Sequence, residues 1–104
     1  MGESPGALTE AAFYTLLSLF KPNHGYGIMQ TVESMSNGRV KLGAGTMYGS
    51  LNNLLGKGWI MELVQRDRKK EYLITDLGKM VVQQEMNRLA ELWTNGQHIL
   101  QGGN

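Results

Sequence analysis

The chain has 104 residues, no cysteine and a formal net charge of +1. This length provides for one domain with room for an appended helix, and the absence of cysteine excludes disulfides and thiolate metal sites. The charge is uneven, because residues 39–79 hold eight of the ten Lys and Arg but only four of the nine Asp and Glu. A basic middle between acidic ends indicates a face for an anionic partner.

Two helices are expected in the first third of the chain, after a flexible tail over residues 1–7. The first is predicted over residues 8–21, with Thr9 as its N-cap. Its apolar stripe consists of Leu8, Ala12, Leu16, Leu19 and Phe20, flanked by Phe13 and Leu17. Because nearly all of this helix is apolar, it must be buried on more than one side. Pro22 ends it, residues 22–25 have turn chemistry, and a second helix is predicted over residues 26–35.

A third helix is predicted over residues 46–57, capped by Thr46 and closed by Gly58 in a left-handed turn. The link to it is longer than a minimal helix-turn-helix turn, and a very short strand over residues 40–42 would account for the extra length. The inward face carries Met47, Leu51, Leu54 and Leu55, and the opposite face carries Thr46, Gly49, Ser50, Asn53 and Lys57. A short helix with so lean a polar face fits a DNA major groove, although an ordinary amphipathic helix shows the same pattern.

Two runs rich in β-branched and aromatic residues follow, over residues 59–64 and 71–75, and they predict a β-hairpin. The segment between them, residues 65–70, holds four cations and one acid. A solvated turn is polar in any case, but this density of positive charge favours contact with phosphate groups.

The last helix is predicted from Thr75, its N-cap, to about Thr94, because Asn95-Gly96 weakens or ends it. Val82, Met86, Leu89 and Trp93 are spaced 4, 3, 4, and Gly96 and Leu100 would extend this coiled-coil pattern. A helix projecting from a small domain would expose this seam to water. We therefore expect a homodimer; folding of the helix back onto its own core is the alternative. The seam is short, so the first helix would join the interface through Leu8, Ala12 and Leu16.

The predicted order is that of a winged helix-turn-helix domain with a long C-terminal dimerisation helix, a mainly α fold with a small β-hairpin. We expect the DNA-binding domain to span residues 8–75, the dimerisation helix to span residues 76–100, and residues 101–104 to form a tail. Five motifs occur in sequence: H-G-Y-G at 24–27, G-T-M-Y at 45–48, L-N-N-L at 51–54, G-K-G-W-I at 56–60 and K-E-Y-L-I-T-D-L-G at 70–78.

In these motifs the chain resembles the PadR-like transcriptional regulators, and its single helix after the wing resembles their short-tailed subfamily. The resemblance implies a dimeric repressor that binds a palindromic operator in double-stranded DNA and is released by a small molecule. It also implies that a planar aromatic ligand binds between the Trp93 residues of the two protomers, with Phe13, Leu17, Met86 and Leu89 lining the space. The family often has basic residues where Asn52 and Asn53 stand, and often Gly or Pro in the wing, which this chain lacks.

The candidate DNA-binding residues lie on the third helix, in the hairpin and beside them. They are Thr46, Tyr48, Ser50, Asn53 and Lys57 on the helix, Arg66, Arg68, Lys69 and Lys70 in the hairpin, and Lys41 and Tyr26 elsewhere. Asn53 is the candidate for a bidentate contact with adenine. For Tyr48 and Tyr26, the alternative to DNA contact is a role in packing.

No catalytic residue, metal site or cofactor is predicted. The two histidines, His24 and His98, lie in a turn and near a helix end, and no phosphate-binding loop follows a strand. No apolar run reaches the roughly 20 residues of a membrane span, so we expect a cytoplasmic protein without a membrane partner. A winged helix used only for protein–protein contact is the main alternative function. MarR-like regulators are a weaker one, because they usually need more helix on both sides of the core.

Overall fold

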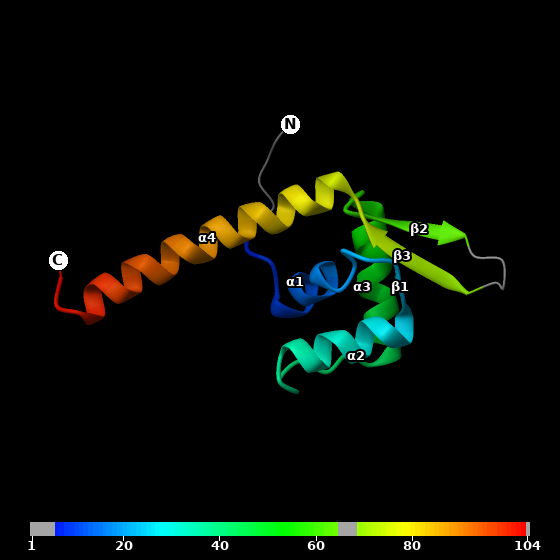
Figure 1. Cartoon of the computed structure of the whole chain (residues 1–104), viewed down its shortest axis with the longest axis horizontal. Helices are drawn as coiled ribbons and strands as arrows, with labels where there is room; N and C mark the ends of the chain where they lie inside the picture. Colours follow the sequence, from blue (N-terminus) through cyan, green and yellow to red (C-terminus); the bar gives the residue numbers. More distant parts are fainter. Residues whose placement is uncertain (1–5, 65–68, 104) are drawn as a thin grey trace.

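A computed structural model describes residues 6–64 and 69–103 of the chain. Figure 1 shows the N-terminal helices packed together with a small sheet, and the C-terminal helix projecting from them. In chain order the elements are α1 (Glu10–Leu17), β1 (Asn23–His24), α2 (Gly25–Met35), α3 (Ala44–Gly56), β2 (Ile60–Val64), β3 (Lys70–Ile74) and α4 (Asp76–Leu100). This mainly helical fold with a wing and a long last helix is the predicted fold class.

The predicted N-cap of α1 is confirmed, because the Thr9 hydroxyl accepts the Ala12 N–H at 3.0 Å, although the helix begins at Glu10 and not at the predicted Leu8. It ends four residues before the predicted Lys21. The N–H of Leu19 turns back to the Leu16 carbonyl, and the Leu19 carbonyl accepts the N–H of Ile74 at 2.8 Å. The chain therefore leaves the helix to meet β3, a long-range contact that the local sequence does not show.

The sheet has one strand in addition to the two of the predicted hairpin. This strand is β1, Asn23–His24, where the sequence predicts a turn. The sheet has the order β1-β3-β2, with Asn23 paired to Tyr72 and Ile60 paired to Ile74, both antiparallel. The prediction of a short strand over residues 40–42 is wrong, since those residues have no regular structure. The extra strand thus precedes α2 instead of following it.

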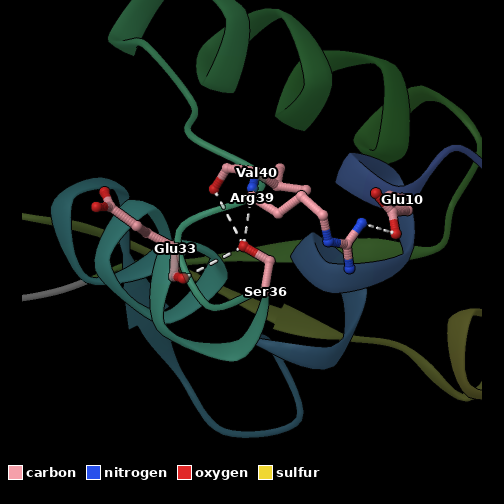
Figure 2. Close-up of polar contacts among 5 residues, drawn as sticks. All are labelled: Glu10, Glu33, Ser36, Arg39 and Val40. Atoms are coloured by element: carbon pink, nitrogen blue, oxygen red, sulfur yellow. Dashed lines mark hydrogen bonds and ion pairs between the residues drawn. The ribbon is translucent and has the colours of Figure 1, made fainter.

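The linker from α2 to α3 is held by one buried hydroxyl instead of a strand. Ser36 Oγ accepts the N–H of Val40 at 2.9 Å and lies 3.2 Å from the carbonyl of Glu33, to which it donates. Figure 2 shows these contacts and the ion pair that Arg39 forms with Glu10 at the start of α1. Left-handed backbone at Asn37 (φ 55°) and Gly38 (φ 79°) ends α2, as the sequence predicts.

Helix α3 starts two residues earlier than predicted. Its N-cap is Gly43, which has no side chain to cap with, so the predicted role of Thr46 as a cap is wrong. The predicted end is confirmed: Gly58 has φ 75°, and the N–H of Trp59 bonds to the Leu54 carbonyl at 3.1 Å.

The start of α4 is tied to the end of α3. The Thr75 hydroxyl donates to the Gly58 carbonyl at 2.7 Å and accepts the N–H of Gly78 at 3.1 Å, while the Thr75 N–H bonds to the Trp59 carbonyl at 2.9 Å. Thr75 is therefore the predicted N-cap and also a bridge between two segments. Gly78 fits because a Cβ there would lie 2.1 Å from the Trp59 carbonyl oxygen.

The core lies between α1, α2, α3 and the sheet. Its buried apolar members are Leu16, Leu19, Ile28, Val32, Met47, Leu51, Leu54, Trp59, Ile60, Tyr72, Ile74, Val81 and Val82. Helix α4 adds only its first turns to this core and continues unbroken through Asn95-Gly96 to Leu100, so the predicted break is wrong. Figure 1 shows its C-terminal half extending away from the other elements.

The junction at Gly78 generates a stability prediction. We expect Gly78→Ala to lower the free energy of unfolding by about 2–3 kcal/mol, because the new methyl group meets a backbone carbonyl that cannot move freely. Urea unfolding followed by circular dichroism measures it. The matched control is Gly49→Ala in α3, where a Cβ meets nothing within 4 Å. That variant should keep or raise the stability, and equal stability of both variants would contradict the prediction.

Candidate nucleic-acid interface

Helix α3 presents an outward ridge of glycine and asparagine. Each ridge position lies two residues from a buried one of Met47, Leu51 and Leu54, which in a helix places it on the opposite side. We call this set the α3 ridge; it consists of Gly45, Gly49, Asn52, Asn53 and Gly56, and all five are exposed. Glycine inside a helix costs roughly 0.5–1 kcal/mol relative to alanine. The glycines of the ridge are therefore unfavourable for the stability of α3.

One flank of the ridge faces α2 and the wing, which is the hairpin of β2 and β3. A surface hollow of about 470 Å³ lies there, and it is lined by His24, Gly25, Tyr26, Tyr48, Lys69, Lys70 and Tyr72. Three phenol rings and two ammonium groups thus meet beside the start of α2. Burial of Tyr72 raises the pKa of its hydroxyl, so this group stays protonated and can donate a hydrogen bond.

The H-G-Y-G motif shapes this hollow. His24 caps α2, since its Nδ1 accepts the N–H of Gly27 at 3.2 Å. Gly25 leaves room for Tyr48, whose hydroxyl lies 2.9 Å from where a Cβ of residue 25 would be, and Gly27 leaves room for the Asn23 amide. The motif therefore fixes the tyrosine of α3 against the start of α2.

The other flank of the ridge faces α1. Thr46, Gly49, Ser50, Asn53 and Lys57 line a second hollow of about 470 Å³; its other lining residues are Leu42, Leu54, Trp59, Ala7, Leu8, Thr9, Ala11 and Ala12. The Lys57 ammonium lies 4.6 Å from the centre of the Trp59 ring. The four polar side chains therefore lie along the side of α3 that faces α1, and Gly49 and Asn53 belong both to this side and to the ridge. Asn52, which is not among the predicted residues, is also exposed.

The remaining basic candidates are spread around the wing and the linker. Lys41 is exposed in the linker before α3, and Lys69 and Lys70 are exposed on the wing. The Lys70 ammonium lies 3.9 Å from a Glu62 carboxylate oxygen in a largely exposed pair, an arrangement worth little energy. Arg66 and Arg68, which were predicted to contact phosphates, lie outside the described residues.

The predicted interface residues, on α4 and in or just before α1, lie in two different environments. Met86, Leu89 and Trp93 are exposed, Trp93 to 67%, and Leu92, Ile99 and Leu100 extend the apolar surface toward the C-terminus. Leu16 and Val82 are instead buried at 0% and 7% exposure. These two side chains belong to the core of the chain itself, which removes them from the predicted interface. Leu8 and Ala12 keep partial exposure.

Of the five predicted ligand-binding residues, the structure brings two together. Phe13 and Leu89 share a hollow of about 210 Å³ between α1 and α4, whereas Leu17, Met86 and Trp93 do not line it. At its edge Arg88 donates hydrogen bonds of 2.8 and 2.6 Å to Glu85, which also accepts the N–H of Leu8 at 3.3 Å. The hydrogen-bonded guanidinium of Arg88 lowers the pKa of the nearly buried Glu85 carboxyl, so this group stays charged.

Within residues 6–64 and 69–103, no three His, Asp or Glu side chains gather as metal ligands would. No helix in the same ranges combines the length and apolarity that a bilayer crossing requires.

Comparisons with known proteins point to one family. The family described as "Transcriptional regulator PadR-like family" matches residues 14–84. A Streptomyces fradiae protein, an uncharacterized 37.1 kDa protein in transposon TN4556, is 32% identical over 71 residues, which cover 68% of this chain and 20% of that protein. The chain thus spans about a fifth of the length of the curated relative that it matches.

Solved structures agree at the level of the fold. A PadR family transcription regulator from hypervirulent Clostridium difficile R20291 superposes with a TM-score of 0.75 at 20% identity, covering 88% of this chain and 99% of that one. A PadR family transcriptional regulator from Eggerthella lenta DSM 2243 gives a TM-score of 0.63 at 22% identity, covering 89% and 82%.

Proposed function

The chain belongs to the PadR-like family of transcriptional regulators, which are non-enzymatic DNA-binding proteins, and we propose that it acts as a homodimeric cytoplasmic repressor. In this proposal two copies bind a palindromic operator in double-stranded DNA, and a small planar aromatic ligand at the dimer interface releases them. The observation that carries the proposal is the pairing of the exposed surface of α3 and the wing, in the body of the molecule, with an apolar stripe left uncovered on the projecting α4.

The hollow beside the wing supports DNA binding. Lys69, Lys70 and the hydroxyls of Tyr26 and Tyr48 line one surface next to α3. Ammonium and hydroxyl groups of this kind contact DNA phosphates, and such contacts set the register of a recognition helix on the duplex. In the sequence, Arg66 and Arg68 add two more cations directly before Lys69.

The exposed stripe of α4 supports dimerisation. Large apolar side chains exposed on one long helix are unfavourable in water, and a second copy of the same helix is the simplest cover. A two-fold dimer would present two α3 helices about 34 Å apart, which is the spacing of successive major grooves on one side of DNA.

The ligand proposal rests on Trp93 and its neighbours. Trp93 is exposed on the stripe that would meet its counterpart in a dimer. Two indole rings facing each other across a two-fold axis would form a flat apolar slot, and methionine at Met86 would adapt its width.

DNA binding is tested by titrating the protein with the DNA upstream of its own gene and with an unrelated duplex, at several salt concentrations. We expect tight, salt-dependent binding to the upstream DNA. Lys69→Ala with Lys70→Ala should weaken binding to both duplexes and reduce the slope of log K against log salt by about 1–2. Lys79→Ala, which removes one positive charge from α4, is the control for loss of a cation outside the wing. An unchanged slope in the wing variant would remove the wing from the interface, and a stable dimer without any DNA binding would favour the protein-interaction module.

Dimerisation is tested by sedimentation velocity. We expect the wild-type chain to sediment as a dimer and Trp93→Glu to sediment as a monomer, because the new carboxylate would have to be desolvated in the seam. Glu91→Lys alters charge on the other side of α4 and should remain dimeric. A dimeric Trp93→Glu variant would show that the interface lies elsewhere.

Ligand binding is tested by fluorescence in the Trp59→Phe variant, in which Trp93 is the remaining tryptophan. We expect planar aromatic compounds to quench its emission, and the compounds that quench most should also release the protein from DNA. A panel in which no compound changes the emission would remove the main support for a site at Trp93.

A further inference from the structure

The geometry points to Tyr72 as the buried donor of a site for one phosphate group, formed where the wing meets the start of α2. The inference rests on the proposed function, because the phosphate that it invokes is one of the DNA backbone. Tyr72 lies in β3, and it is not among the residues that the sequence predicts for DNA contact. Its ring belongs to the hydrophobic core, but its hydroxyl has no role there.

The Tyr72 hydroxyl has no partner within the described part of the chain. Tyr72 is only 5% exposed, and its hydroxyl makes no hydrogen bond to any residue of 6–64 and 69–103. In the same ranges no fully enclosed side-chain oxygen or nitrogen lacks a partner, so this hydroxyl reaches the hollow that Tyr72 lines. A buried tyrosine hydroxyl usually has a hydrogen-bond partner. We therefore expect its partner to be a molecule that enters the hollow.

The groups around this hydroxyl select an anionic partner. Burial, the charge of Glu62 and the neighbouring hydroxyl of Tyr48 raise the pKa of Tyr72, so its hydroxyl keeps its proton and can donate. The other polar side chains of the hollow include two ammonium groups and no carboxylate; they are those of His24, Tyr26, Tyr48, Lys69 and Lys70. A surface with this composition favours a group that carries negative charge and accepts hydrogen bonds.

The acid nearest to Tyr72 does not change this preference. Glu62 pairs with Tyr72 across the sheet but does not line the hollow. Its carboxylate lies 3.9 Å from the Lys70 ammonium, which offsets its charge. Because so exposed a pair is worth little energy, it does not prevent Lys70 from binding an anion.

The start of α2 adds a second feature that favours phosphate. Gly25 begins this helix and lines the hollow, and a Cβ there would lie 2.9 Å from the Tyr48 hydroxyl. The first N–H groups of a helix lack partners within it and attract anions, and the first turn of α2 contains no acidic residue. Lysine, tyrosine and helix N-termini are all donors that contact the phosphates of DNA. Here the three kinds of donor meet in one hollow.

The first arm of the test uses the full-length protein and the duplex that it selects from a random DNA pool. Single phosphates of this duplex are replaced by uncharged methylphosphonates. We expect Tyr72→Phe to lower the affinity for the unmodified duplex by roughly tenfold. The slope of log K against log salt should stay the same, because a hydroxyl carries no charge. At one phosphate in each half-site, the loss caused by the methylphosphonate should be roughly tenfold smaller in Tyr72→Phe than in the wild-type protein.

Tyr14→Phe is the matched control. It removes the hydroxyl of the fourth tyrosine, which does not line the hollow, and it should leave the affinity unchanged. Both variants keep the aromatic ring, and their melting temperatures show whether the fold is intact. The difference between methylphosphonate positions is a readout that a role of Tyr72 in packing alone would not produce.

The second arm uses inorganic phosphate without DNA, titrated into isotope-labelled protein at constant ionic strength and followed by NMR. We expect the amide signals of Gly25 and Tyr26 to shift in the wild-type protein and in Tyr14→Phe, but not in Tyr72→Phe. Coupling to a DNA phosphate without these shifts would assign the site to DNA alone. Shifts without coupling would assign it to a free phosphate compound.

Specific DNA binding that shows neither the coupling nor the shifts would overturn the inference and leave the proposed function standing. A protein that binds no DNA, yet shows the shifts through Tyr72, would instead overturn the proposed function and keep the phosphate site.

Discussion

The relative placement of α3 and the long last helix, α4, depends on one small hydrogen-bond cluster. Thr75 contacts both Gly58 and Trp59 at the end of α3 and caps α4 through Gly78. The hydroxyl satisfies a carbonyl at the end of one helix and an N–H at the start of another, groups that helices leave unpaired. Because Gly78 has no Cβ, the first turn of α4 can sit directly on the Trp59 carbonyl. The fold thereby sets the direction in which α4 leaves the domain.

The proposed DNA interface has few charges on α3 itself. Lys57, in the turn directly after α3, lies with its ammonium 4.6 Å from the centre of the Trp59 ring. Positive charge is concentrated on the wing and its basic segment instead. Phosphate contacts from the wing would supply affinity that does not depend on the DNA sequence. Helix α3, whose outward residues are small, would supply a close fit to the major groove. This division explains how a chain with a net charge of +1 can belong to a family of DNA-binding proteins.

The sequence predicts the fold well wherever the signal is local. The caps at Thr9 and Thr75 and the left-handed turn at Gly58 depend on a few neighbouring residues, and the structure confirms all three. The strand at Asn23–His24 depends on β3, which lies some fifty residues away, so no local pattern reveals it. At Asn95-Gly96 the local sequence predicts a helix end that the structure does not have. Its propensity cost is about 1 kcal/mol and is too small to end a long helix in mid-course.

The site is harder to predict because glycine carries no polarity signal. Polar side chains alone select Thr46, Ser50, Asn53 and Lys57 on α3, and of these Asn53 also lies on the ridge. The direction opposite the core follows from the buried residues Met47, Leu51 and Leu54. In the proposed dimer this direction has a second consequence. Since Thr75 ties α4 to α3, a ligand that changes the angle between two α4 helices would also change the distance between the two ridges. DNA release would then need no contact between the ligand and α3, because two ridges with the wrong separation cannot occupy successive major grooves together.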